Sequence, residues 1–527
     1  MNKFLSWNYE ISNAAQNCLT PSDTVRHRPT NTLLFAILFF FSVIGAYAEL
    51  ESSTDMDTVE YSMPLVLSLE AAQRRALADN PDLQAVEMRV RQAAEKVRQA
   101  RAAFFPSVDL DWSAIHTQLP DSTIREARSS IRTGFMSTLS RTLFMPVISP
   151  LTTASTLATS AYQSSAAYNA VPESVDNYNV SITVGYALFT GFARKHAYAL
   201  ARFGEKETQA AADEAQRLML EAVAQTYYGA QLANERVIIT EADKAFNRRL
   251  LDEAHARNRA GAASQSEVLN FEVRWRASEA QHIGATQDYR LALIALAALM
   301  GVEDAALPGD TALTPLEPAT EEELSLPDFE TLCNTAWEMR PDLEGSRNAV
   351  NRSQANVGLQ QAAYYPTVTA FASKDASRSD DGNFEGQDFS STVGVGLSYN
   401  LFAGGKRRAA VAEARQAHKE AEYRLQAAEI AVAQDVREAL TRLEAAQQQL
   451  SLQLENAGYV EQNRDMVQKE FQAGLTSLAL LNQAQRDLVE AQATLALARV
   501  SLRAAWHSLK TATAETLSSV LANEAEE

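Results

Sequence analysis

The sequence has few of the residues that usually build metal or redox sites: its 527 residues include two cysteines and seven histidines. No HExxH pattern occurs, and no group of cysteines and histidines has the spacing of a zinc site. The stretch around Gly404 is incomplete as a phosphate-binding loop, because Asn400 replaces its first glycine and Arg407 its final Ser or Thr. We therefore expect a protein without enzymatic activity, without a cofactor and without a bound metal.

Long hydrophobic runs are almost absent. The one exception, residues 33–44, follows two arginines and precedes a small-x-small pattern at residues 46–48. A helix needs roughly 20 residues to span about 30 Å of bilayer. We therefore predict that residues 1–48 are a secretory signal peptide cut after Ala48, a membrane anchor being the alternative. The remaining sequence has no apolar run of spanning length, which excludes a helical membrane protein.

Disulfide bonds and positive net charge are lacking as well. Once the signal peptide is removed, Cys333 has no second cysteine to pair with, so stability must come from packing or assembly. The chain carries 47 Lys and Arg against 66 Asp and Glu, a net charge of -19. This balance disfavours nucleic acids and anionic lipid surfaces as partners.

What the sequence does contain is an internal repeat. NPDL at residues 80–83 returns as RPDL at residues 340–343, and AAFFPSV at residues 102–108 returns as AAYYPTV at residues 362–368. Both pairs are separated by 260 positions, as Asn80 and Arg340 are. YALFTG, which begins at residue 186, returns as YNLFAG at residue 399, which is 213 positions on. The difference between the two offsets places 47 additional residues in the first half, between Pro106 and Tyr186.

Each half ends in a predicted helical hairpin. Residues 193–259 and 406–472 lack proline and are rich in Ala, Gln, Glu and Arg, and such helices would be about 100 Å long. In the Gly-x-x-Ser motif after each, the glycine suits a tight turn and the serine caps a returning helix of about 36 residues. The motif residues are Gly261, Ser264, Gly474 and Ser477. A narrow apolar seam suited to coiled-coil packing consists of Val432, Val436, Leu440, Leu443, Leu450 and Leu454.

Before each long helix the hydrophobic period changes to two. Residues 107–114, 178–189, 367–373 and 391–402 alternate apolar and polar side chains, as strands do. Strands with one apolar face and aromatic ends are typical of a transmembrane β-barrel, although a small soluble sheet alternates in the same way. Four strands cannot close a barrel, which takes at least about eight. Because lipid does not tolerate an open edge, we expect two or three chains to pool eight or twelve strands.

The repeated phrase marks two predicted strand-to-helix junctions. We expect its tyrosines at the membrane interface and its phenylalanines at the strand ends, and its glycines would let the chain turn directly into the helix. These residues are Tyr186, Phe189, Gly191, Tyr399, Phe402 and Gly404.

These features divide the chain into five segments. They are the signal peptide (1–48), a first repeat (49–300), a linker (301–326), a second repeat (327–514) and an acidic tail (515–527). The first repeat contains a strand pair with a long external loop at about 115–177 and a hairpin at 193–300. The second contains a strand pair at 367–402 and a hairpin at 406–514.

In the order and duplication of these motifs, the sequence resembles the TolC-like outer-membrane efflux protein family from about Leu67 to Leu509. The resemblance implies a mixed α and transmembrane β fold. A homotrimer would form a twelve-stranded outer-membrane β-barrel, with four strands per chain, continuous with a long periplasmic α-helical coiled-coil barrel. Such a protein is the passive exit duct of a tripartite efflux or type I secretion system. A periplasmic coiled-coil adaptor or scaffold is the alternative function.

The resemblance also implies partners and site residues. The partners are a periplasmic adaptor (membrane fusion) protein, a proton-driven or ATP-driven inner-membrane transporter and outer-membrane lipid, with no nucleic acid. The adaptor would dock at the helix tips, which are Gly261, Ser264, Gly474 and Ser477. The periplasmic constriction would consist of Glu267, Phe471, Thr476, Leu480 and Gln483. Thr476 stands where the family has an arginine, so we expect a hydrophobic and polar constriction in place of an arginine-carboxylate latch.

The 47 additional residues would lie in the external loop. Residues 122–144 alternate basic and apolar groups and could form a helix, and a Ser, Thr and Ala-rich run follows as far as Asn169. A lid or a contact with surface polysaccharide is the functional interpretation. An insertion that the loop merely tolerates is the alternative.

Overall fold

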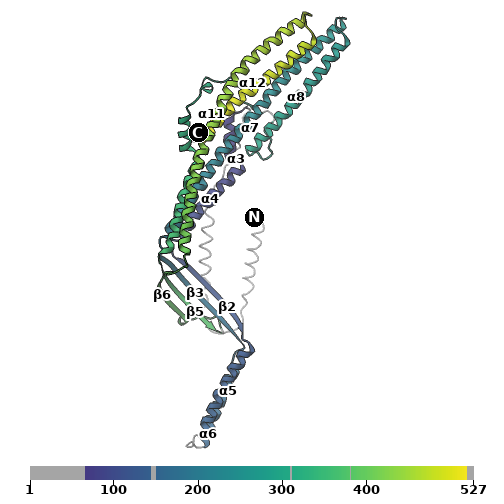
Figure 1. The fold of residues 1–527 in the computed structure, drawn as a ribbon. Coiled ribbons are helices and arrows are strands. Elements are labelled where there is room, and N and C mark those ends of the chain that lie inside the picture. Colours follow the sequence, from purple (N-terminus) through teal and green to yellow (C-terminus); the bar gives the residue numbers. More distant parts are fainter. Residues whose placement is uncertain (1–65, 144–149, 309–310, 380, 519–527) are drawn as a thin grey trace. The chain divides into compact units, whose positions relative to one another are not determined.

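The structure is a computed structural model that describes residues 66–143, 150–308, 311–379 and 381–518 (Figure 1). The predicted signal peptide and residues 519–527 of the predicted tail lie outside the described residues. Within the described ranges, no helix is both long enough and apolar enough to cross a membrane.

Two long helical hairpins are the main elements (Figure 1). α7 (Ala193–Arg259) and α11 (Lys406–Gln472) have 67 residues each and begin and end where the proline-free segments predicted. The returning helices α8 (Gln265–Leu299) and α12 (Leu478–Ala512) have 35 residues each. The long helices continue without a break because they lack proline and consist mostly of residues with high helix propensity.

The hairpin turns have the predicted geometry. Gly261 and Gly474 have φ of +77° and +76°, a backbone conformation that costs glycine little. The Oγ of Ser264 accepts a hydrogen bond from the backbone N–H three residues later at 3.2 Å, and Ser477 does the same at 3.4 Å. The Gly-x-x-Ser motif therefore ends one helix and caps the next.

Shorter helices precede each strand pair. They are α3 (Leu69–Asp79), α4 (Pro81–Ala102), α9 (Phe329–Met339), α10 (Pro341–Gln361) and the 3-10 turns η1 (Glu322–Leu324) and η2 (Ala362–Tyr364). A further 3-10 turn, η3 (Gly386–Asp388), lies inside the second strand pair. In the first PDL turn, Asn80 Oδ1 accepts from the N–H of Asp82 at 2.9 Å. Pro81 is the first residue of α4, where the missing N–H of proline leaves no hydrogen bond unmade.

The predicted seam on α11 forms part of an apolar core, against α9, α10 and α12. Val432, Val436, Leu443 and Leu450 are buried, and Leu440 is partly buried. This core also contains Leu332, Cys333, Leu343, Leu502 and Leu509.

The seam prediction was wrong for Leu454, which is 46% exposed. Beyond Leu450 the next buried position is Ala457, and Val467 follows it. Leu443, Leu450 and Ala457 are seven residues apart, so the seam keeps the heptad spacing and Leu454 falls outside it.

Four antiparallel strands form one sheet in the order β2-β3-β5-β6. They are β2 (Ser107–Gln118), β3 (Ser174–Phe189), β5 (Thr367–Ser379) and β6 (Phe389–Ser398), and a separate parallel pair is formed by β1 (Val66–Leu67) and β4 (Ala312–Leu313). Within the described chain β2 and β6 are edge strands. The apolar side chains of these two edges are exposed, including Trp112 at 67% and Val393 at 84%.

The second strand pair ends earlier than predicted. β6 stops at Ser398, which pairs with Thr367 at the start of β5, so Tyr399 and Phe402 lie beyond the strand. In contrast, Phe189 is the last residue of β3 and pairs with Val368. The prediction that Phe402 closes a strand was wrong because, among the described residues, those after Ser398 have no partner strand.

The insertion in the first half is helical. α5 (Asp121–Leu143) confirms the helix expected at 122–144, and α6 (Pro150–Asn169) adds a second helix for which the sequence carried no prediction. β2 extends to Gln118 and β3 starts at Ser174. The connection between them therefore covers residues 119–173 rather than the predicted 115–177.

Candidate functional site

The first strand-to-helix junction needs its glycine. Gly191 has φ of +61°, and a Cβ there would lie 2.6 Å from the carbonyl oxygen of Ala362 and 2.7 Å from Cβ of Tyr365. Gly404 has φ of +56° with open space around it. Both glycines therefore suit the turn, but only Gly191 is also required by a close approach.

The side chain of one arginine contacts several segments at this junction. The guanidinium of Arg194 lies over the rings of Phe104 and Tyr186, at 5.4 and 5.7 Å from their centroids. The same group donates hydrogen bonds to the carbonyls of Ala103 at 3.2 Å and Leu188 at 3.4 Å. One side chain therefore joins the end of α4, the end of β3 and the start of α7.

Arg407 makes the same set of contacts in the second half. Its guanidinium lies over Tyr364 and Tyr399 at 5.4 and 6.0 Å, and it donates to the carbonyls of Ala363 and Leu401, both at 3.3 Å. The sequence analysis did not assign this role to either arginine. Their repetition after LFxG was the available signal.

At the hairpin tips, two predicted constriction residues come together through an arginine. Arg257 Nη1 lies 3.7 Å from Glu267 Oε1, and its guanidinium lies 5.7 Å from the ring centroid of Phe471. Phe471 also makes an edge contact with Phe271, with centroids 6.4 Å apart. These residues belong to α7, α8 and α11, so the cluster joins the two hairpins. The sequence analysis missed Arg257 because it looked for the arginine at Thr476.

The other three predicted constriction residues are not part of this cluster of contacts. Thr476 is half-buried, and Leu480 is 47% exposed. Gln483 hydrogen-bonds to Asp487 at 2.6 Å and to Arg486, both on its own helix.

A buried polar contact links the hairpins further from the tips. Gln485 Nε2 on α12 donates to Asp243 Oδ1 on α7 at 2.7 Å, and Asn247 Nδ2 donates to Asp243 Oδ2 at 3.0 Å. Burial raises the pKa of the Asp243 carboxyl, and the two amide hydrogen bonds oppose that rise. The carboxylate is therefore held by both hairpins.

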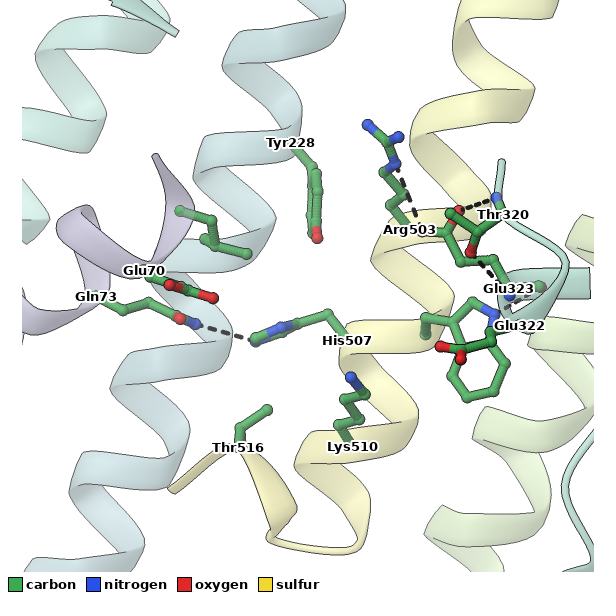
Figure 2. Close-up of a pocket in the computed structure, with 12 residues that line it drawn as sticks. Glu70, Gln73, Tyr228, Thr320, Glu322, Glu323, Arg503, His507, Lys510 and Thr516 are labelled. Carbon is green, nitrogen blue, oxygen red and sulfur yellow. Dashed lines mark hydrogen bonds and ion pairs between the residues drawn. The ribbon is translucent and has the colours of Figure 1, made fainter. Parts of the chain in front are cut away.

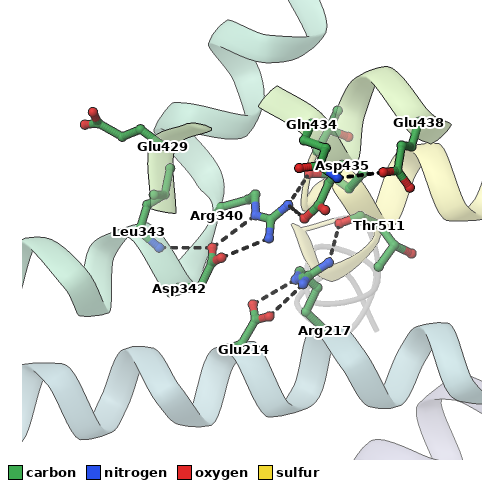
Figure 3. A network of polar contacts seen from close by, with 12 residues as sticks. Glu214, Arg217, Arg340, Asp342, Leu343, Glu429, Gln434, Asp435, Glu438 and Thr511 are labelled. Carbon is green, nitrogen blue, oxygen red and sulfur yellow. Dashed lines mark hydrogen bonds and ion pairs between the residues drawn. The ribbon is translucent and has the colours of Figure 1, made fainter. Parts of the chain in front are cut away.

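Two buried arginines connect helices that lie far apart in the sequence: Arg340 joins the start of α10 to α11, and Arg217 joins α7 to α12 (Figure 3). Arg340 pairs with Asp342 and Asp435, both at 2.9 Å, and Arg217 pairs with Glu214 at 2.6 Å. Arg217 also donates to the carbonyl of Thr511 at 2.8 Å. Charge-assisted bonds of this kind hold planar groups in one orientation.

A polar cavity of about 570 Å³ lies between α3, α7, α12 and η1, and Figure 2 shows its lining. Gln73 Nε2 lies 3.3 Å from His507 Nε2 across it and 3.1 Å from the carbonyl of Leu220. Burial lowers the pKa of His507 to about 4 and raises that of Tyr228 to about 12. In the described ranges, no group of three or more His, Cys, Asp or Glu side chains could hold a metal ion.

Comparison with known proteins shows the family of the chain. A sequence model of the outer membrane efflux protein family matches residues 73–302 and 332–515, more than half of the chain. The alkaline protease secretion protein AprF of Pseudomonas aeruginosa is 26% identical over 306 residues, which are 55% of this chain and 60% of AprF. Protein CyaE of Bordetella pertussis is 28% identical over 61% of this chain and 67% of CyaE.

A solved structure has the same fold. The outer membrane channel MtrE of Neisseria gonorrhoeae, in its open state, superposes with a TM-score of 0.64 at 16% sequence identity, over 84% of this chain and 88% of MtrE. The predicted resemblance is thereby confirmed, and the chain belongs to the outer membrane efflux protein family.

Proposed function

We propose that the protein is the outer-membrane exit duct of a tripartite efflux or type I secretion system and conducts substrates passively. The observation that carries this proposal is a sheet whose apolar side chains are exposed, in a chain of this family. In the single chain, the side chains of Val108, Leu110 and Trp112 on β2 are exposed, as are those of Val393 and Leu397 on β6. Such a face is stable against lipid rather than water.

The two free edges favour pooling of strands between chains. β2 and β6 are the edges of the sheet in the described chain. An unpaired edge leaves backbone N–H and C=O groups that lipid cannot satisfy, so β2 of one copy would pair with β6 of the next. In a homotrimer the twelve strands would close a barrel, and the long hairpins would continue it as a periplasmic tunnel. Exposed apolar residues on the helices, such as Val273 and Tyr459, would then pack between copies.

We infer that each chain arose as two repeats, with the limits predicted from the sequence. The duplicated contacts of Arg194 and Arg407 support this inference, since the paired residues differ by the same offsets as the motifs. Each repeat would then contribute one strand pair and one hairpin to the duct.

We also propose that the hairpin tips carry the partner contacts. The turns around Gly261 and Gly474 are exposed, and Leu475 is 79% exposed. An apolar side chain on a tight turn suits docking by a periplasmic adaptor, which would connect the duct to an inner-membrane transporter. The cluster of Arg257, Glu267 and Phe471 would narrow the duct close to these tips.

The deciding experiment is the native mass and conductance of the full chain extracted from outer membranes in mild detergent. A mass of three chains, together with steady single-channel currents after reconstitution, is expected. A monomer that stays in solution without detergent and shows no conductance would instead support the second candidate, a periplasmic coiled-coil adaptor or scaffold.

A further inference from the structure

The insertion between β2 and β3 has a charge opposite to that of the whole chain. α6 contains no charged residue. α5 carries two acidic residues, Asp121 and Glu126, and four arginines, Arg125, Arg128, Arg132 and Arg141. The chain as a whole has a net charge of -19. Since charges are screened beyond a Debye length of about 8 Å at physiological ionic strength, a surface that touches α5 meets a basic helix.

The strand register places this helical pair at one end of the sheet. Gln118 pairs with Ser174 next to α5 and α6, whereas Ser107 pairs with Gly185 at the opposite end of the same two strands. The opposite end leads into α4 and α7. In the proposed arrangement, with the long helices in the periplasm, α5 and α6 therefore lie on the external side of the outer membrane.

Three of the arginines lie along one side of α5. Arg125, Arg128 and Arg132 are three and four residues apart, which brings their side chains together on a helix. Arg128 is held in place, with Nη2 3.5 Å from Glu173 and its guanidinium 5.4 Å from the ring centroid of Tyr168. Arg125 and Arg132 are exposed, and among the described residues neither has an acidic partner within ion-pair distance. The one side-chain bond of Arg125 reaches the backbone carbonyl of Asp121 at 3.2 Å.

The corresponding connection in the second half differs. Between β5 and β6, Arg378 pairs with Asp381 at 2.7 Å and with Asp388 at 3.0 Å. The positive charge there is neutralised inside the connection. Exposed and unpaired arginines are therefore a property of α5 and not of every connection at this end of the sheet.

We propose that α5 is a docking surface for phosphorylated glycolipid in the outer leaflet of the outer membrane. Guanidinium groups bind phosphate oxygens with paired, charge-assisted hydrogen bonds. The exposed Arg125 and Arg132 would lie on the lipid phosphates, whereas Arg128, whose guanidinium lies over the ring of Tyr168 on α6, would stay against that helix. This inference rests on the proposed function, because only that arrangement puts α5 beside the outer leaflet.

The test uses the full chain in nanodiscs of phosphatidylcholine and measures binding of labelled lipopolysaccharide with phosphorylated lipid A. The variant Arg125→Gln/Arg132→Gln removes the two unpaired charges. The matched control Arg89→Gln/Arg415→Gln removes two exposed arginines from α4 and α11. The α5 variant is expected to bind about ten-fold more weakly or worse, because each arginine near an anionic lipid surface contributes about 1 kcal/mol. The control should bind as the unmodified chain does, and binding should fall in about 1 M salt.

Three results would overturn the docking surface. The α5 variant could bind as tightly as the control, dephosphorylated lipopolysaccharide could bind equally well, or phosphatidylglycerol could compete equally well, which would mean attraction to any anion. Single-channel current from the same nanodisc samples, transferred to planar bilayers, separates the two proposals. Normal current without lipopolysaccharide preference refutes only the docking surface, whereas absent current refutes the exit duct as well.

Discussion

Asn80 and Arg340 make the same connection in the two halves of the chain. Asn80 Nδ2 donates to the carbonyl of Leu299 at 2.9 Å, and Arg340 Nη1 donates to the carbonyl of Ala512 at 3.4 Å. The donors are 260 positions apart and the acceptors 213, which are the two offsets of the sequence repeat. A short helix is thus tied to the end of the hairpin by an amide in one half and by a guanidinium in the other.

Arg340→Ala is expected to lower the free energy of unfolding by about 2–3 kcal/mol, because it leaves Asp342 and Asp435 without their buried partner. Both acids keep some contact with water, which holds the loss below that of a fully buried pair. Unfolding in guanidinium chloride would measure it. Arg442→Ala, which breaks an exposed pair with Glu438, should change stability by at most about 0.5 kcal/mol. Equal losses in the two variants would refute the role of Arg340.

Arg194→Lys and Arg407→Lys are each expected to cost about 1–2 kcal/mol, because an ammonium cannot stack on two rings and bond two carbonyls at once. The heat stability of the assembled protein in detergent is the measurement. Arg101→Lys, at an exposed position near the end of α4, is the control. A lysine that performs as well as arginine at both junctions would show that charge alone matters there.

Stability is expected to fall as the pH decreases from 6.5 towards 4. His507 has its pKa lowered from 6.5 to about 4 by burial, so its neutral form is favoured in the folded protein. Since Gln73 Nε2 donates towards His507 Nε2, protonation would also remove an acceptor. The stabilising contribution of neutral His507 to the free energy of unfolding is fully present above pH 6.5, and its complete loss at low pH amounts to about 3 kcal/mol.

The variant His507→Gln isolates this effect. Unfolding midpoints between pH 7 and pH 4 should fall less steeply in the variant than in the unmodified protein. Parallel curves would mean that other groups cause the acid sensitivity.

Arg257→Gln is expected to raise the open-to-closed ratio of single channels about two- to five-fold, because a partly exposed ion pair contributes up to about 1 kcal/mol. The variant loses the contacts of Arg257 with Glu267 and Phe471 that join the hairpins. Arg276→Gln removes a pair confined to α8, with Glu279 at 3.2 Å, and should leave gating unchanged. Gating that changes equally in both variants would argue against a specific role of the tip cluster.

Leu480→Asp is expected to increase the cation selectivity of the open pore, since a trimer would place three carboxylates at the constriction. Reversal potentials in a salt gradient provide the measurement. Leu452→Asp, on an exposed position of α11, adds the same charges elsewhere. Unchanged ion preference in the Leu480 variant would mean that this residue does not line the constriction.

The residues that the sequence analysis located best are those whose role is local. The limits of α7 and α11, the positive φ of Gly261 and the capping by Ser264 depend on proline, glycine and serine within a few positions. The end of β6 was misplaced because strand length depends on a partner strand, and the alternation of residues 391–402 continues past the point where β5 begins.

By itself, the sequence determined the order of strands and long helices, the tight turns of the hairpins and the duplicated motifs, because these depend on neighbours along the chain. Only the tertiary structure decided that Arg257 reaches Glu267 and Phe471, that Arg194 and Arg407 each bind two backbone carbonyls at their strand-to-helix junctions, and that Asp243 is shared between hairpins. Such contacts join residues from different helices and strands. They depend on which faces pack together, and that is set by the burial of the whole core rather than by any local pattern.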